Sequence, residues 1–592
     1  MKQFFKMMFA SALGAVVAFG LIVVLTTLVF AGIIATMSNK PAYFPKENTV
    51  FKLSLNGAVH ENLEANPFSE LFGGNELGIS LKDIVRAIRI AKTNDNIKGV
   101  YLEAGAMFAA GTPVIDVIRS ELAALKEQGK FVVAYADNYT QGAYYLCSVA
   151  NKVFMNPAGM ALVTGRSAQY EFYKGLGEKI GLEFMIFKVG THKGAVEPYM
   201  LNKLSEENRN QITSYQTEIW NAVTKNIAAA RNISPETINE YANKGYFLSS
   251  KSQAVEMGIV DELRYKSDVE DYIKRLAEQT GERLHTVSLS KMNSIKESAG
   301  INKNKIAILY AEGEISTKVV SSIPQSGGIN EDILDAIIKL KNDNMVKAVV
   351  MRVNSRGGSA YISEQIWHEI EELKKEKPVV VSMSDIAASG GYYISCGASK
   401  IFAEPTTLTG SIGVFAMIPN FAGLYRKLDM TTDVVKTNRF SDLGDASRPW
   451  REDEKALFQA LVEDGYDLFL TRCAEGRKMS KEAIDAIAQG RVWTGSQALE
   501  NGLIDALGGL DDAVAAAAEL ADLSEGDYDI SYSSGAKDFL LDFIEKQIGN
   551  IKASVVESII GEEEYKILNN AHRLKAQSGL MARLPFEIDA AL

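Results

Sequence analysis

Two short motifs carry the side chains that could do chemistry, and they lie far apart along the chain. Ser389 stands in the run A-A-S-G-G-Y-Y, and Lys193 stands in the run G-T-H-K-G-A-V-E-P. A serine hydroxyl is a poor nucleophile unless a base accepts its proton, and a lysine amine can be that base once burial lowers its pKa. The two residue types together predict acyl transfer through an acyl-enzyme on Ser389.

Glycine-rich turns near Ser389 could stabilise the oxyanion of such a reaction. Gly357 and Gly358 follow an expected strand, and Gly390 follows Ser389 at an expected strand-to-helix turn. Glycine adopts the unusual backbone angles that such turns need, and N–H groups at the turn can point at an anion. Each motif alone is more typical of an ordinary tight turn, so the prediction of an acyl-transfer site depends on their combination.

The serine and the lysine belong to different copies of an internal repeat. Three stretches match stretches 248 residues later: 94–96 with 342–344, 131–137 with 379–385, and 142–145 with 390–393. The first copy has Gln141 where the second has Ser389, and the same offset carries Lys193 onto Ser441. Neither copy has both groups, so we expect one composite site that draws on both.

Alternating strands and helices must position these motifs. Apolar runs predict buried strands at 100–102, 306–310 and 349–351, and amphipathic patterns predict helices at 331–340 and 363–374. Such alternation favours a mostly parallel α/β core in each copy.

The repeat also predicts where the domains lie. We expect an N-terminal domain at 45–290 that carries the general-base lysine and a C-terminal domain at 304–545 that carries the nucleophilic serine. The polar stretch between them contains Ser288 and Lys291 at S-x-x-K spacing, but no glycine-rich turn accompanies this pair, and we attribute it to chance. No motif assigns a role to the tail at 546–592.

An apolar stretch, residues 8–37, precedes both copies and contains no charged residue. It is long enough to cross about 30 Å of hydrocarbon and longer than the hydrophobic core of a cleavable signal peptide. We predict a retained transmembrane anchor there, with a cytoplasmic N-terminus at 1–7. Lysines on both sides of the stretch give this orientation only weak support.

Composition and missing motifs exclude several classes of protein. The chain has 592 residues with a net charge of −11, the wrong sign for coating nucleic acid. It contains no CxxC, no HExxH and no phosphate loop, so we expect no metal and no cofactor. No G-x-S-x-G elbow surrounds a serine. The three cysteines are expected to be small buried hydrophobes: Cys147, Cys396 and Cys473.

Taken in order, these motifs resemble those of the long form of the bacterial signal peptide peptidase A family, membrane-anchored serine proteases of the Clp protease/crotonase superfamily. The resemblance covers N-S-x-G-G, A-A-S-G-G-Y-Y and L-T-G-S-I-G in the second copy and G-T-H-K-G-A-V-E-P in the first. It implies an α/β fold of tandem duplicated Clp protease/crotonase-like domains behind a transmembrane helix. The site residues that it implies are Ser389 as nucleophile, Lys193 as general base, Ser411 as the partner of the lysine amine, and the backbone N–H groups of Gly358 and Gly390 in the oxyanion hole.

The same resemblance implies a substrate, an assembly and a place in the cell. It predicts a serine endopeptidase with a Ser/Lys dyad that degrades signal-peptide remnants, as a homotetramer on the periplasmic side of the bacterial cytoplasmic membrane. Arg356 stands where many relatives have proline, and His192 precedes the lysine where other residues are common, but neither departure removes a catalytic group. The alternatives are a crotonase-like acyl-CoA enzyme and a catalytically silent membrane scaffold.

Overall fold

The described part of the chain comprises two α/β halves and a short C-terminal strand. The computed structural model describes residues 14, 43–63, 78–249, 251–295, 302–317, 328–534 and 580–583. The predicted anchor at 8–37, apart from residue 14, and the N-terminus at 1–7 lie outside these ranges, as does most of the tail at 546–592. Among the helices within these ranges, none has the length and apolar character needed to span a bilayer.

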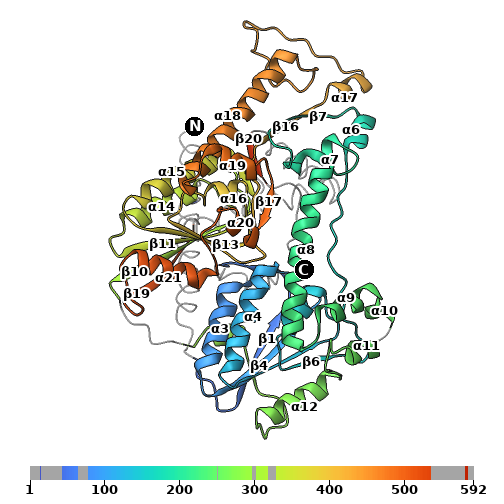
Figure 1. Ribbon diagram of the computed structural model, residues 1–592, viewed down its shortest axis with the longest axis vertical. Helices are drawn as coiled ribbons and strands as arrows, with labels where there is room; N and C mark the ends of the chain where they lie inside the picture. The colour runs from blue at the N-terminus through green and yellow to red at the C-terminus, as the bar shows by residue number, and fades with distance from the viewer. Residues whose placement is uncertain are drawn as a thin grey trace, which may run out of the picture.

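The first half folds around a six-stranded parallel sheet (Figure 1). Its strand order is β8 (Glu262–Leu263), β6 (Lys152–Met155), β5 (Phe131–Ala136), β4 (Ile97–Ala104), β1 (Thr49–Leu55) and β9 (Thr286–Ser288). Successive side chains of a strand point to opposite faces of the sheet. Phe51 and Leu53 therefore pack under helices α3 (Leu81–Thr93) and α4 (Thr112–Glu127), whereas Val50 packs with α12 (Lys266–Leu276) on the opposite face.

The second half repeats this plan. Its strand order is β17 (Val492–Thr494), β15 (Leu408–Gly410), β13 (Val379–Ala388), β11 (Val346–Ser355), β10 (Asn304–Glu312) and β19 (Tyr528–Ser534), with β14 (Lys400–Ala403) and β18 (Ala506–Leu507) extending from β13. Helices α14 (Asp332–Asn342) and α15 (Ala360–Lys374) cover one face, and α21 (Leu510–Leu520) covers the other. The predicted mixed α/β class and the tandem duplication are confirmed. So are the predicted strands at 100–102, 306–310 and 349–351 and the predicted amphipathic helices at 331–340 and 363–374, the latter to within a few residues at their ends.

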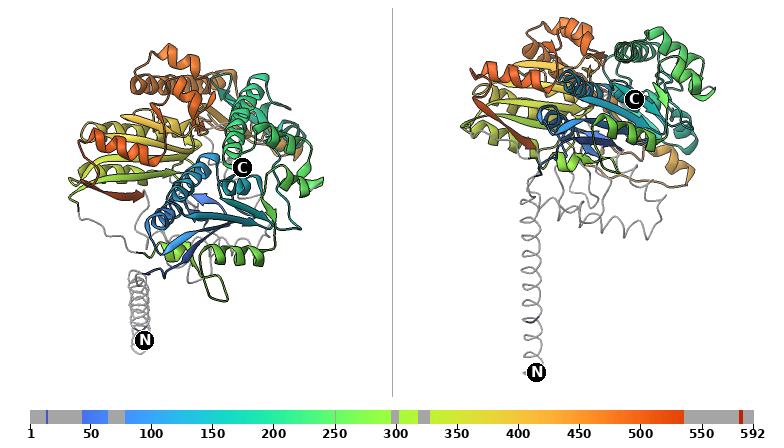
Figure 2. Two further views of the ribbon diagram at one scale, coloured as in Figure 1. Left: turned by 60° about the horizontal axis from the view of Figure 1, so that its bottom comes forward. Right: turned by 90° about the horizontal axis from the view of Figure 1, so that it is seen from below.

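A four-stranded antiparallel sheet joins the halves. Its order is β12 (Gly357–Ser359), β20 (Leu580–Arg583), β16 (Phe415–Asn420) and β7 (Glu183–Lys188). Only β7 comes from the first half, and it pairs with β16 along its whole length. Because β7 leads directly into the turn that carries Lys193, this pairing brings the lysine against the second half. Figure 2 shows the two halves side by side from two further directions.

Buried polar contacts also hold the halves together. Arg352 on β11 donates from Nε to a carboxylate oxygen of Glu61 at 2.8 Å, and both side chains are almost fully buried. Asp385 on β13 accepts hydrogen bonds from the backbone amides of Gly111, at 3.2 Å, and Val114, at 3.1 Å, at the start of α4. Burial and the charge of Glu61 raise the pKa of Asp385 to about 7.

Candidate active site

Lys193 and Ser389 come from different halves and lie within hydrogen-bond distance of each other. The Nζ atom of Lys193 is 2.7 Å from Oγ of Ser389, although the residues are 196 positions apart. Neither residue has exposed surface. A nucleophile and a base at this separation can exchange a proton directly.

Ser389 occupies a strained turn between β13 and helix α16 (Gly390–Tyr393). Its backbone angles are φ 56° and ψ −114°, a conformation that costs a residue with a Cβ about 1–3 kcal/mol. The turn is fixed on both sides, because the Ser389 amide donates to the Gly410 carbonyl at 2.8 Å and the Tyr393 amide donates to the Ser389 carbonyl at 2.8 Å. The fixed backbone therefore holds the hydroxyl toward Lys193.

Lys193 is a buried amine whose described hydrogen-bond partners carry no charge. Its Nζ donates to the backbone carbonyl of Ser411 at 3.0 Å and to the Ser411 hydroxyl at 3.2 Å. Burial, the one cause of the shift, holds the pKa of Lys193 well below its ordinary value. A neutral amine has two N–H groups and one lone pair. Ser411 can accept both N–H groups, which leaves the lone pair for the proton of Ser389.

The turn around Lys193 is held in place by contacts that no sequence motif predicted. Gly490 has φ 83° and packs so closely that a Cβ there would lie 2.6 Å from the backbone nitrogen of Lys193. The side chain of Gln211, on α8 (Glu206–Arg231), donates to the carbonyl of His192 at 3.1 Å and accepts from the amide of Val492 at 3.1 Å. Gln211 thus bridges the lysine-bearing turn and β17 of the second half.

Glycine backbones lie beside Ser389 where an oxyanion would form. Gly357 has φ 90° and Gly358 has φ 155°. A Cβ on Gly357 would lie 2.6 Å from the backbone nitrogen of Gly390, so any side chain there would obstruct the Gly390 amide. The amide of Gly357 donates to the hydroxyl of Ser355 at 3.1 Å. Among these three glycines, Gly358 and Gly390 therefore remain as candidate oxyanion donors.

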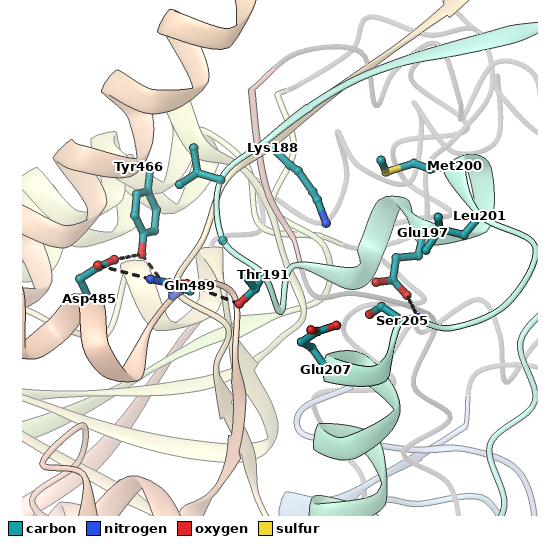
Figure 3. Close-up of a pocket in the computed structure, with 12 residues that line it drawn as sticks. Lys188, Thr191, Glu197, Met200, Leu201, Ser205, Glu207, Tyr466, Asp485 and Gln489 are labelled. Atoms are coloured by element: carbon teal, nitrogen blue, oxygen red, sulfur yellow. Dashed lines mark hydrogen bonds between the residues drawn. The ribbon is translucent and has the colours of Figure 1, made fainter.

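A separate pocket of about 570 Å³ adjoins the turn that carries Lys193 (Figure 3). Thr191 and Glu197 line it from the first half, and Tyr466 lines it from the second. Neither Lys193 nor Ser389 is among the described residues that line it, so this pocket is not the place where the two groups meet.

The three cysteines are buried and unpaired, as predicted. Within the described ranges, no cluster of three or more His, Cys, Asp or Glu side chains could hold a metal ion.

Comparison with known proteins gives matches in both halves. The sequence profile of Peptidase family S49 matches residues 124–280 and 371–524. Protease 4 of Haemophilus influenzae is 36% identical over 492 residues, which cover 79% of this chain and 78% of that protein. The chloroplastic serine protease SPPA of Arabidopsis thaliana is 32% identical and covers 81% of this chain and 70% of its own. An Enterococcus faecium protein named as a signal peptide peptidase, SppA, is 37% identical over 36% of this chain and 63% of its own.

Proposed function

Since this chain belongs to peptidase family S49 and is a serine peptidase, we propose that it is a membrane-anchored endopeptidase that uses Ser389 and Lys193 as its catalytic dyad. Its substrates are signal-peptide remnants at the cytoplasmic membrane. The motif resemblance and the relative named as a signal peptide peptidase support this substrate class. The same resemblance supports a periplasmic catalytic body and a homotetramer.

The reaction proceeds in two steps. In the first, Oγ of Ser389 attacks the carbonyl carbon of the scissile peptide bond while neutral Lys193 takes the hydroxyl proton. The amides of Gly358 and Gly390 stabilise the resulting oxyanion. The C–N bond then breaks, and the Lys193 ammonium gives its proton to the leaving amine. In the second step Lys193 deprotonates a water molecule, whose oxygen attacks the carbonyl carbon of the ester on Ser389. The ester C–O bond breaks, and Lys193 returns the proton to Oγ of Ser389.

One observation carries this proposal: the buried amine of Lys193 lies 2.7 Å from the Ser389 hydroxyl, and two oxygen atoms of Ser411 can accept its two N–H groups. This arrangement suits proton abstraction from Ser389. A structural ion pair would instead place a carboxylate beside the ammonium.

Hydrolysis of a signal-peptide fragment by the purified full-length chain tests the proposal. Ser389→Ala and Lys193→Met should each lower kcat/KM at least about 1,000-fold, because each removes one half of a unit that acts together. Ser288→Ala and Lys291→Met are matched controls from the other S-x-x-K pair and should cleave like the wild type. If Ser389→Ala or Lys193→Met cleaves the peptide as fast as the wild type does, the mechanism is wrong. Binding of a CoA thioester without any peptide hydrolysis would instead favour the acyl-CoA alternative.

A further inference from the structure

Strand β13 bulges and changes its neighbouring strand shortly before it reaches Ser389. Residues 380–383 pair with β14, whereas residues 386–388 pair with β15. On the other edge of β13, the single residue Asn354 of β11 lies opposite three residues, 384–386. Bulges of this kind recur beside active sites, where they change the direction of the chain that follows. The bulge at 384–386 therefore determines where the end of β13 lies.

The end of β13 carries Ser389, and its neighbour β15 leads to Ser411. Ala388 pairs with Gly410, the last residue of β15, and the Ser389 amide donates to the Gly410 carbonyl at 2.8 Å. Ser411 follows Gly410 directly. The nucleophile and the hydrogen-bond partner of the lysine amine are thus joined to each other. Both depend on the bulge for their position relative to Lys193 of the first half.

Both polar residues of the bulge are bound by the first half. The hydroxyl of Ser384 donates to a carboxylate oxygen of Glu61. The carboxylate of Asp385 accepts from the amide of Gly111 at 3.2 Å and from the amide of Val114 at 3.1 Å. Val114 is the third residue of α4, so its N–H group has no partner within the helix. Asp385 therefore supplies, from the second half, the acceptor that an N-cap side chain would supply.

Gly111 leaves room for this carboxylate. It is the N-cap residue of α4, and its angles of φ −71° and ψ 161° suit residues other than glycine. A Cβ on Gly111 would overlap the carboxylate carbon of Asp385. The Asp385 carboxylate thus occupies the space of the missing N-cap side chain, and the cap of α4 is complete only when the bulge of β13 docks against it.

We propose that Asp385 is a positioning residue for the reaction: by tying the bulge of β13 to the start of α4, it holds Ser389 and Ser411 within reach of Lys193. This inference rests on the dyad of the proposed function. The amine of Lys193 and the hydroxyl of Ser389 are 2.7 Å apart, a separation at which small displacements slow a reaction strongly. Loss of the tie should therefore lower the rate of acylation rather than the affinity for the acylating molecule.

The rate at which a serine-reactive β-lactone acylates Ser389 in the full-length chain, measured in detergent at pH 8, tests this role. Asp385→Ala should lower the maximal first-order rate constant at least about tenfold and change the half-saturating β-lactone concentration less than about twofold. Asp137→Ala is the matched control, because Asp137 occupies the corresponding position of the first copy. Asp137 is exposed and accepts from the Tyr135 hydroxyl of its own half at 2.7 Å, so this variant should react at the wild-type rate.

A second substitution separates the position of Ser389 from the cap of α4. Gly111→Ser added to Asp385→Ala returns an N-cap hydroxyl to the helix but leaves the bulge untied. Hydrogen exchange of the amides at 112–116 should be faster in Asp385→Ala than in the wild type and slower again in the double variant. Acylation of Ser389 should stay as slow in the double variant as in Asp385→Ala. Recovery of the wild-type acylation rate would show that Asp385 only caps α4, and the inference would be wrong.

Asp385→Asn keeps one oxygen acceptor for the two amides and tests the same role if Asp385→Ala does not fold. Its rate of acylation should be at least about threefold below that of the wild type. Acylation of Asp385→Asn and of Asp385→Ala at the wild-type rate would refute the positioning role and leave the dyad intact.

The acylation assay also keeps this inference separate from the proposed function. If the wild type acquires no label on Ser389, the dyad and the positioning role are both wrong. If the variants react as predicted but the wild type hydrolyses no signal-peptide fragment, the positioning role is supported and the proposed substrate is wrong.

Discussion

Replacing Lys193 with methionine should change how the free energy of unfolding depends on pH. The native state buries the amine and lowers its pKa, whereas the unfolded chain exposes it with an ordinary pKa of about 10.4. Between the two pKa values the unfolded state therefore binds one more proton than the native state. Stability must rise with pH across that window, and Lys193→Met should lose this dependence.

The size of the effect follows from one proton. Over a window in which the native amine is neutral and the unfolded amine is charged, each pH unit changes the free energy of unfolding by about 1.4 kcal/mol. From pH 8 to pH 9.5, the free energy of unfolding of a chain with Lys193 should therefore rise by about 2 kcal/mol more than that of the methionine variant. Both chains should carry Ser389→Ala, so that proteolysis does not disturb the comparison.

Denaturant unfolding of the full-length chain in detergent, followed by tryptophan fluorescence, measures this difference at the two pH values. Lys203→Met in the same Ser389→Ala background replaces an exposed lysine and should show no such pH-dependent gain. If the free energies of unfolding of the Lys193→Met variant and its parent differ by the same amount at pH 8 and at pH 9.5, Lys193 is charged in the native state. A charged amine has no lone pair for the serine proton, so the assignment of Lys193 as the general base would then be wrong.

Three further changes probe the backbone and polar groups around the site. Ser389→Gly should be inactive yet more stable than Ser389→Ala by about 1–2 kcal/mol in denaturant unfolding, because glycine relieves the strain at φ 56°; equal stabilities would refute that strain. Ser411→Ala keeps the carbonyl acceptor and loses the hydroxyl, so kcat for peptide hydrolysis should fall about tenfold with KM little changed, and an unaltered kcat would rule out this role for the hydroxyl. Asp385 has a pKa raised to about 7, so the native state holds a proton that the unfolded state releases, and stability should fall as pH rises from 4.5 to 7. Asp385→Asn should remove about 3 kcal/mol of that fall, measured by unfolding at the two pH values, and an unchanged fall would contradict the raised pKa.

The sequence was enough to predict the two halves and the residue types that meet between them. Apolar runs such as the one around Val349 specify buried strands locally. The repeat shows that a serine in one copy occupies the position of a glutamine in the other. The prediction of a shared site depends only on such comparisons. The structure adds the distance of 2.7 Å and the burial that gives the lysine its chemistry.

Other parts of the site could not be predicted, because they depend on contacts between distant segments. β12 has three residues and β20 has four, too few for a hydrophobic period, and their pairing joins Gly357 to Arg583 across the chain. Gln211 is one polar residue in a long helix, where side chains usually face water. Its role arises only because His192 and Val492 approach it from different halves.

Covalent labelling tests most directly whether Ser389 is the nucleophile and Lys193 its base. A serine-reactive acylating probe added to the full-length chain at pH 8 should add one label, which peptide mapping should locate on Ser389. Lys193→Met should lose the label, while Lys203→Met should react at the wild-type rate. A label on another serine, or labelling of Lys193→Met as fast as the wild type, would contradict the division of nucleophile and base between the two halves.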